Sequence, residues 1–460
     1  MKKIISFLKT DVKIINSYFL FTIVLIILVC IGYTSYALFS FTKTSNNVIE
    51  ATVGKIEKKP NAPVLASNMI PVYYDETTET WKKADLANPN NTYKWYNYNN
   101  GMWANAVTVT SSSRSKYLNA SIGTAISMND ITTMWVWIPR FNAATPSNYN
   151  GGTKTSPGAI DVTFVKSNET AIDAFTFGNK ELSGFWYAKF ETSHSTLTSS
   201  TTNNNLGCSN ERCSNANGII IKPNVKSLRY NNVSNFFFAS RSMEKSGNSF
   251  GFVSTEVDTH MSKNNEWGAV AYLTQSIYGR CTNSTTCSEV GINNNSGYLT
   301  GYGAPAGSSS SVANGAYNTT LGKNASTTGT IYGIYDMNGG AVEYVMGVLA
   351  DTNGKPRSGY NSSSNSGFTG MLNDGTTYTG IAFPDSKYYN LYTGSSYTGH
   401  ALTETAGWYS DFAGFVFTGS SWFFRGGNYN TSALSGVFFF NNRNGDSSNI
   451  SSSRPVISNK

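Results

Sequence analysis

Charged side chains are scarce in this sequence of 460 residues. They make up 13% of the chain, roughly half of the share that is usual in soluble proteins. Runs of Asn, Ser, Thr and Gly supply polar surface in their place. The formal net charge is +7, but four lysines and one aspartate lie within the first thirteen residues. No basic stripe remains in the rest of the chain, so the sequence predicts no nucleic-acid partner.

Residues that serve in common catalytic sites are also few. The chain has three histidines in polar, loop-like settings, which we expect at the surface: His194, His260 and His400. It lacks the G-x-S-x-G sequence that presents a nucleophilic serine. A pair of carboxylates for glycoside hydrolysis, such as Glu343 with Asp351 or Asp411, stays open because that chemistry needs only a suitable separation.

Cysteine spacing argues against zinc and against thiol redox catalysis. No C-x-x-C sequence is present. Cys30 lies in an apolar run, and two close pairs lie outside it: Cys208 with Cys213, and Cys281 with Cys287. An even number of cysteines in an exported segment indicates disulfides. All three pairings of the four cysteines stay open, and the sequence assigns no metal ligands.

The most apolar stretch lies near the start of the chain. Residues 14–42 contain no charge, and residues 18–31 are almost wholly apolar, enough with their flanks for the roughly 20 residues of a membrane span. Lysines precede the stretch, which predicts a cytoplasmic N-terminus and export of the rest. We expect a single-pass anchor at the cell membrane. The alternative is a signal peptide cleaved near Ala37, which leaves a secreted protein.

Composition divides the remainder into three parts. Residues 43–66 show no clear period and predict a stalk. Residues 67–130 carry two hairpin-like pieces around turn-rich segments and predict a small β subdomain. Residues 131–460 form the main domain, in which residues 225–243 and 263–278 have apolar side chains at helical spacing.

The run at residues 331–346 carries a recognisable signature. Its sequence Y-D-M-N-G-G-A-V-E-Y resembles the D-M-x-G-N-V-W-E-W motif of the formylglycine-generating enzyme family. The matching residues are Asp336, Met337, Gly339 and Glu343, and the departures are Gly340, Val342 and Tyr344. Three further segments resemble family elements: Phe185, Lys189, Glu191 and Thr192; Glu266, Trp267 and Ala269; and Trp422, Arg425, Gly426 and Gly427. Arg454 begins a stretch that is similar to the closing strand of the family.

The resemblance implies an α+β fold of the C-type-lectin-like kind, with two helices, mixed short strands and long loops, after a transmembrane helix and a small β region. Eight residues then take structural roles: Asp336, Gly339, Glu343, Trp422, Arg425, Gly426, Gly427 and Arg454. We expect Glu343 and Arg425 to be buried and to bond to the backbone or to each other, because a buried charge needs a partner.

The resemblance carries over less to activity. The enzymes of the family use a pair of thiols after the R-G-G element to bind copper, and this chain has no cysteine between Gly427 and Arg454. Serine cannot replace a thiolate in that chemistry. We therefore expect no enzyme and no cofactor, and a surface protein that binds an unknown protein or carbohydrate ligand. An altered oxidase or other surface enzyme and a structural envelope protein remain as alternatives.

The segment between Gly427 and Arg454 is the expected binding face. It is dense in Asn, Ser, Phe, Tyr and Gly, which supply adaptable hydrogen bonds and rigid aromatic area. Its position resembles that of the variable residues in proteins altered by diversity-generating retroelements. The expected ligand-contacting residues are Tyr429, Asn430, Ser432, Ala433, Ser435, Phe438, Phe440, Asn442, Asp446, Ser448 and Ile450.

Overall fold

The structure is a computed structural model. It describes residues 49–52, 55–58, 62–87, 95–198, 200–202, 204–310, 315–357, 368–371 and 377–460, and these belong to one unit, Val48–Lys460. Among these residues no helix combines the length and the apolarity that crossing a bilayer requires. The expected span at residues 14–42 lies outside the described residues.

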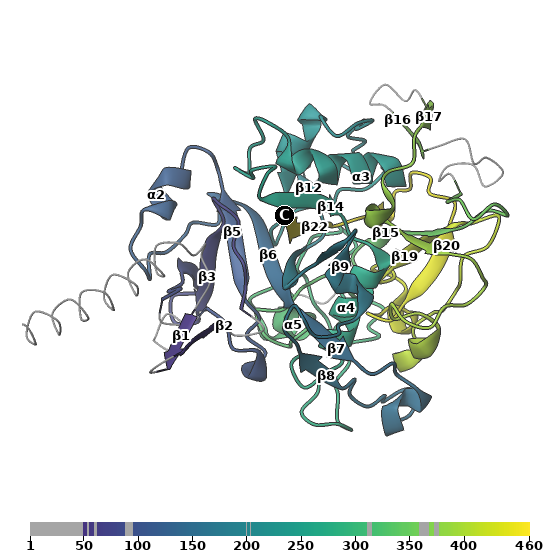
Figure 1. Cartoon of the computed structure of the whole chain (residues 1–460), viewed down its shortest axis with the longest axis horizontal. Coiled ribbons are helices and arrows are strands. Elements are labelled where there is room, and N and C mark those ends of the chain that lie inside the picture. The colour runs from purple at the N-terminus through teal and green to yellow at the C-terminus, as the bar shows by residue number, and fades with distance from the viewer. Residues whose placement is uncertain are drawn as a thin grey trace, which may run out of the picture. The chain divides into compact units, whose positions relative to one another are not determined.

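A seven-stranded sheet in which all neighbours are antiparallel dominates this unit (Figure 1). From edge to edge it consists of β14 (Val257–Met261), β22 (Pro455–Asn459), β11 (Gly184–Ala188), β6 (Ile131–Pro139), β5 (Asn105–Val109), β3 (Ile70–Asp75) and β4 (Thr80–Lys83). The C-terminal strand β22 therefore lies inside the sheet, between β14 and β11. Strand β6 is buried along nearly its whole length, which accounts for its continuous aromatic and β-branched sequence.

A second sheet carries the signature at residues 331–346. Its strands are β18 (Asn390–Tyr392), β15 (Val342–Leu349), β19 (Trp422–Arg425) and β20 (Phe440–Arg443), with β21 (Ser451–Ser452) also paired to β15. Strand β15 is antiparallel to β19 and parallel to β18 and β21. Its residues Val342–Val348 are all buried, so the central strand of this sheet is covered on both faces.

Short elements complete the described chain. The two-stranded sheets pair β1 (Ile49–Thr52) with β2 (Lys55–Lys58), β7 (Phe141–Ala143) with β8 (Val162–Phe164), β9 (Thr176–Phe177) with β10 (Lys180–Glu181), β12 (Ser193–His194) with β13 (Ile219–Ile220), and β16 (Phe368–Met371) with β17 (Thr377–Ile381). The helices are α2 (Arg114–Leu118), α3 (Val233–Arg241), α4 (Asn264–Thr274) and α5 (Thr320–Asn324). The 3-10 turns are η1 (Tyr98–Asn100), η2 (Asn148–Gly151), η3 (Asp173–Phe175), η4 (Ser214–Gly218), η5 (Ser242–Glu244), η6 (Ser386–Tyr388), η7 (Thr403–Thr405), η8 (Trp408–Ser410) and η9 (Ser432–Leu434).

The expected α+β fold of the lectin type is wrong, because the described chain is mostly sheet with few helices. The helical spacing of apolar residues at 225–243 predicts a longer helix than the structure contains. Tyr230 takes a left-handed φ of 65°, Asn232 is extended, and α3 begins only after it. Strands β3, β4 and β5, expected in a small β region of their own, extend the seven-stranded sheet because β5 pairs with β6.

Tryptophan fills the core. All nine tryptophans of the sequence are buried, including Trp135 and Trp137 on β6 and Trp186 on β11. The Trp137 and Trp186 rings lie 5.2 Å apart at an interplanar angle of 61°, an edge-to-face arrangement that is favourable for aromatic pairs. The high aromatic content of a chain poor in charge therefore goes largely into packing.

Candidate functional site

An ion pair between Glu343 and Arg454 lies at the junction of the two sheets. Arg454 Nε lies 2.6 Å from Glu343 Oε2, and its Nη2 contacts Oε1. The other terminal nitrogen donates to the carbonyl oxygens of Ala188 (3.0 Å) and Tyr335 (3.1 Å). Both charged side chains are buried. The planar guanidinium thus joins β11, the signature loop and β15 through bonds of fixed direction.

Two more carboxylates lie close to this pair. Asp336 accepts hydrogen bonds from Gly301 N and Asn293 Nδ2, each at 2.8 Å. Glu191 accepts one from Ala341 N at 2.8 Å. Burial, followed by the charges of Asp336 and Glu343, raises the pKa of Glu191 well above its usual value. Burial likewise raises the pKa values of Asp336 and Glu343.

Arg425 lies opposite Glu343 in the β15 and β19 register, yet the two side chains do not pair. Arg425 donates to Asn264 Oδ1 at 3.0 Å and to the carbonyl oxygens of His400 (3.4 Å) and Ala401 (2.8 Å). Burial lowers the pKa of this guanidinium to about 10. Arg425 thus donates hydrogen bonds to Asn264 and to the backbone, whereas Glu343 forms its ion pair with Arg454.

Gly426 and Gly427 turn the chain away from β19. Their φ angles are 85° and 69°, in the region that favours glycine. A Cβ on Gly427 would lie 2.4 Å from Ser435 Oγ, and that hydroxyl donates to Gly426 O at 2.7 Å. Gly426 O also accepts from Gly339 N at 3.0 Å. The turn is therefore tied to both the following loop and the signature.

The same loop is also bonded to helix α4. Trp267, on that helix, donates from its Nε1 to Val437 O at 3.0 Å. Trp422, at the start of β19, is buried against the rings of Phe368 and Phe383. The residues expected to be structural are thus all buried, and they fix both ends of the segment that follows Gly427.

The structure divides the expected ligand-contacting residues into two groups. Seven are exposed or partly exposed: Tyr429, Asn430, Ser432, Ala433, Asn442, Asp446 and Ile450. Four are buried and do not reach the surface: Ser435, Phe438, Phe440 and Ser448. Phe438 packs on Trp408 with ring centroids 5.0 Å apart, and Phe440 lies under the Arg425 guanidinium. The buried group supports the segment from below.

Two apolar residues that sequence reasoning missed extend this surface. Phe412 is 42% exposed and Leu434 is 50% exposed, and they are neighbours because Phe412 N donates to Leu434 O at 3.0 Å. We call Phe412, Tyr429, Asn430, Ala433 and Leu434 the C-terminal face. An isolated leucine within the polar run after Gly427 is the signal that could have found it.

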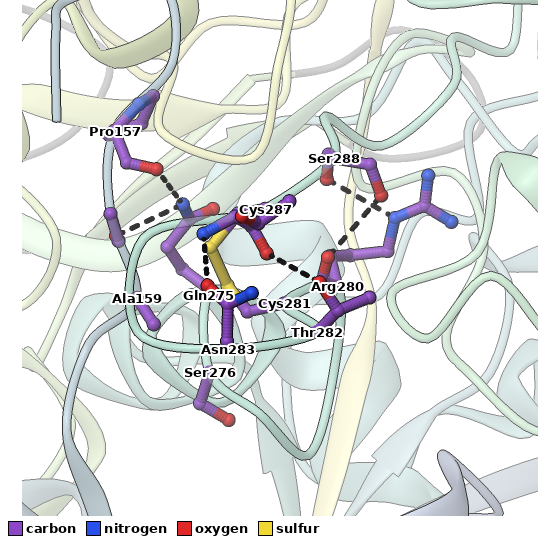
Figure 2. Close-up of a disulfide and its surroundings, with 12 residues drawn as sticks. Pro157, Ala159, Gln275, Ser276, Arg280, Cys281, Thr282, Asn283, Cys287 and Ser288 are labelled. Carbon is purple, nitrogen blue, oxygen red and sulfur yellow. Dashed lines mark hydrogen bonds between the residues drawn. A yellow bond between two sulfur atoms is a disulfide. The ribbon is translucent and has the colours of Figure 1, made fainter.

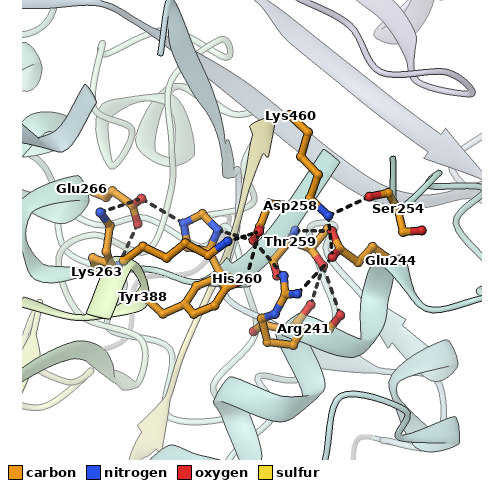
Figure 3. Close-up of polar contacts among 12 residues, drawn as sticks. Arg241, Glu244, Ser254, Asp258, Thr259, His260, Lys263, Glu266, Tyr388 and Lys460 are labelled. Carbon is orange, nitrogen blue, oxygen red and sulfur yellow. Dashed lines mark hydrogen bonds and ion pairs between the residues drawn. The ribbon is translucent and has the colours of Figure 1, made fainter. Parts of the chain in front are cut away.

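The histidines are buried, contrary to the expectation of surface positions. His260 lies on β14 between two carboxylates, with Nε2 2.9 Å from Glu266 and Nδ1 3.5 Å from Asp258 (Figure 3). Burial opposes protonation, but Glu266 and Asp258 outweigh it and raise the pKa of His260. Arg241 binds Asp258 from the other side at 2.7 Å. Polar residues on β14 thus form a buried charge network between α3 and α4.

The carboxylates considered for hydrolysis have other partners. Asp351 Oδ1 accepts hydrogen bonds from the backbone of Asn353 and Lys355 in a turn. Asp411 is buried, and its Oδ2 accepts from Phe438 N at 3.0 Å. Glu343 is held by Arg454. In the part of the chain that the structure describes, no group of three or more His, Cys, Asp or Glu side chains is placed to hold a metal ion.

The prediction of disulfides is confirmed. Cys208 bonds to Cys213 and Cys281 bonds to Cys287, so each close pair closes its own local loop. Figure 2 shows the second loop beside Gln275 and Arg280. Thr282 N donates to Thr286 O at 2.9 Å inside it. The bond therefore closes a short turn that hydrogen bonds also hold.

Residues from five separate motifs meet in this core. Glu191 N donates to Asp336, Arg454 donates to Glu343, and the charges of the two pairs interact with each other. Trp267 lies under the guanidinium groups of Arg425 and Arg454. No family model matches this chain, and no curated protein matches it.

Proposed function

We propose that this chain is a cell-surface protein, of the adhesin or receptor kind, that binds a ligand on its C-terminal face. The observation that carries the proposal is the division of the segment after Gly427. Exposed polar, aromatic and apolar side chains lie on it, while buried residues hold its two ends. We propose further that the chain is a non-enzymatic relative of the formylglycine-generating enzyme family.

Buried residues at the two ends of the segment after Gly427, which we call the frame, are held independently of the exposed side chains. Arg425 bonds to backbone at one end, and Arg454 bonds to Glu343 at the other. Substitutions at exposed positions usually change the free energy of unfolding by less than about 0.5 kcal/mol. The face can therefore vary in chemistry while the frame keeps its shape.

The chemistry of the face suits recognition. Tyr429 and Asn430 offer an aromatic ring and an amide, which adapt to many partners. Phe412 and Leu434 add exposed apolar area to the C-terminal face, and apolar area enclosed by polar groups is typical of the centre of an interface. Tyr298 extends the aromatic surface inward, since its ring lies 4.9 Å from that of Tyr429.

We also propose that the exposed residues of this segment are diversified by a reverse-transcriptase cassette. The test is to sequence the locus in many cells of the source population and to search nearby for a near-duplicate template. Variation at Tyr429, Asn430 and Ala433 with constancy at Phe438 is the expected result. Identical codons everywhere and no template contradict the diversification but leave the binding proposal intact.

Export of residues 43–460 is part of the proposal, with the apolar stretch as anchor. Two disulfides support it, because disulfides persist in oxidising compartments. Protease added to intact cells should digest epitopes of the main domain. Full protection in intact cells together with digestion after lysis contradicts this topology.

Binding is tested by probing a glycan array and a surface-protein array with the purified full chain. For a ligand found in this way, Leu434→Ala and Tyr429→Ala should each weaken binding about tenfold or more, as at the centre of other interfaces. The matched control is Ile122→Ala, because Ile122 is 45% exposed and lies before β6. Equal loss in the control, or binding unchanged in both face variants, contradicts the proposed face.

A further inference from the structure

The second sheet continues beyond β20 into the segment at residues 412–417. Phe440 N donates to Phe412 O at 3.1 Å, and Gly414 N donates to Phe440 O at 2.8 Å. These two bonds place Ala413 opposite Phe440 in parallel, next to β20, the last strand of the sheet (Figure 1). We call residues 412–417 the outer edge. It lies beside the C-terminal face, since Phe412 belongs to both.

The outer edge carries backbone groups without hydrogen bonds. Within the described residues, neither the N–H nor the C=O of Ala413 has a partner, and Phe415 N has none. Ala413 is exposed and Phe415 is half-buried. In an extended strand, the backbone groups of successive residues point to opposite edges. Because Phe412 O and Gly414 N point to β20, the free groups of Ala413 point away from the sheet.

The seven-stranded sheet shows how its own two edges are covered. On β4, Trp81 O accepts a hydrogen bond from Ile126 N at 2.8 Å. On β14, Thr259 N donates to the Glu244 carboxylate at 2.8 Å. Proteins usually cover an edge in such ways, because unpaired backbone groups accept another strand. The outer edge of the second sheet lacks this protection at Ala413.

Apolar side chains flank the free backbone groups. Phe412 is 42% exposed and Phe417 is 55% exposed, and they lie at the two ends of the outer edge. Residues 428–453 contain two charged side chains, Arg443 and Asp446, which pair with each other at 3.1 Å. The outer edge thus offers backbone donors and acceptors between exposed aromatic rings.

We propose that the ligand of the C-terminal face docks as an extended polypeptide strand that pairs with the outer edge. This docking rests on the proposed binding function and narrows the ligand to a protein. Ala413 N–H donates to a carbonyl oxygen of the added strand, and an N–H of that strand donates to Ala413 C=O. Side chains of the added strand that contact Phe412 and Phe417 are apolar, because these rings offer no partner to a charge. A carbohydrate lacks the repeating backbone groups of a strand, so it is the competing ligand class.

The test uses the full chain, purified in detergent micelles, and peptides selected on it from a phage-displayed library of linear peptides. Each selected peptide is synthesised again with N-methyl groups on alternate residues, in both possible registers. Methylation removes the N–H donors from one edge of an extended peptide. One register should raise the Kd about tenfold or more, the loss expected for a good hydrogen bond, and the other should leave it within about twofold.

A variant of the chain tests the same contact from the other side. Ala413→Pro removes the free N–H without breaking a hydrogen bond of the folded chain, and it should raise the Kd of the peptide about tenfold. The matched control Ala413→Val keeps the N–H and should keep the affinity. Addition of the peptide should slow hydrogen exchange at residues 412–417 of the parent, as measured by mass spectrometry.

Near-ultraviolet circular dichroism checks the folding of each variant, and the methylated peptides decide where Ala413→Pro does not fold. Equal affinity in both methylation registers, affinity unchanged in a folded Ala413→Pro chain, or no selected peptide that protects residues 412–417 overturns the docking.

Failure of the docking is distinguishable from failure of the proposed function. A ligand from the arrays that binds more weakly to Leu434→Ala and Tyr429→Ala but equally well to Ala413→Pro binds through side chains of the C-terminal face. That result overturns the strand docking alone. Affinity unchanged in all three variants contradicts both the docking and the face.

Discussion

At the scale of single residues, the buried pair of Glu343 and Arg454 should matter most for stability. Removing one partner leaves the other charge buried and uncompensated, so Glu343→Ala is expected to lower the free energy of unfolding by about 3–5 kcal/mol. Asp161→Ala, which removes an exposed carboxylate, should change it by less than about 0.5 kcal/mol. Urea denaturation of both variants measures the difference. A Glu343→Ala chain as stable as the parent contradicts a structural role for the pair.

His260 should make stability depend on pH. Asp258 and Glu266 flank its ring, and the cations Arg241, Lys263 and Lys387 and the Tyr388 hydroxyl contact these carboxylates. Because folding raises the pKa of His260, its contribution is fully present below the unfolded pKa of about 6.5. The contribution is lost as pH rises through the folded pKa.

The measurement compares the parent with His260→Gln at pH values of about 5.5 and about 9, which lie on either side of the ordinary histidine pKa. The free energy of unfolding of the parent should exceed that of His260→Gln by more at the lower pH than at the higher pH. Asp258 and Glu266 have lowered pKa values. The stability that these two carboxylates contribute is therefore lost only at more acidic pH, when the pH falls through their folded pKa values. A difference that is constant or that grows toward the higher pH rules out the charged pairing of His260.

At the scale of elements, the segment after Gly427 should show two classes of position. Phe438 is buried against Trp408, so Phe438→Ala is expected to cost about 3–5 kcal/mol. Tyr429→Ala and Asn430→Ala remove partly exposed or exposed side chains and should cost less than about 0.5 kcal/mol each. Thermal unfolding of the three variants tests this. Equal costs in both classes contradict the separation of frame and face.

The local disulfides should contribute modestly. Cys281 and Cys287 are six residues apart in sequence, and the loop-entropy relation gives a contribution of about 2 kcal/mol for so short a loop. The double substitution Cys281→Ser with Cys287→Ser should therefore lower the midpoint of urea unfolding while leaving a cooperative transition. Loss of the folded state in this variant shows a larger role than closure of the turn.

At the scale of the whole molecule, local sequence predicted strands better than their assembly. Residues 67–130, expected to carry hairpin-like pieces, contain strands β3, β4 and β5, and paired cysteines form disulfides. The pairing of β5 with β6 could not be predicted, because a local sequence pattern does not show which strands lie next to each other in a sheet. His260 was expected at the surface because β14 reads as polar, and its burial depends on the distant partners Arg241 and Lys387. A core strand whose buried side chains form a charge network is therefore not recognised from the pattern of hydrophobic residues in the sequence.

The placement of β22 leads to a prediction for the whole chain. This strand pairs with β11 on one side and with β14 on the other, so residues 455–460 complete the seven-stranded sheet. A chain ending at Arg454 should not fold, because β14 loses the strand with which it pairs, β11 keeps only its pairing with β6, and the buried Ile457 is removed from the core. A chain lacking only Lys460 should fold, because that residue is exposed. Tryptophan fluorescence during urea unfolding follows both sheets, since Trp81 lies on β4 and Trp422 on β19.

The full chain should therefore unfold in one transition, with fluorescence and far-ultraviolet circular dichroism coinciding. Strands β3, β4 and β5 have no sheet of their own to retain when β6 is lost. Two separate transitions show instead that residues 67–130 and 131–460 fold independently, whereas a folded chain that ends at Arg454 shows that β22 is dispensable for folding. One transition is expected because hydrogen bonding is continuous from β14 to β4, which allows the sheet to unfold as one cooperative unit. Independent folding of the two parts requires instead that the pairing of β5 with β6 be dispensable.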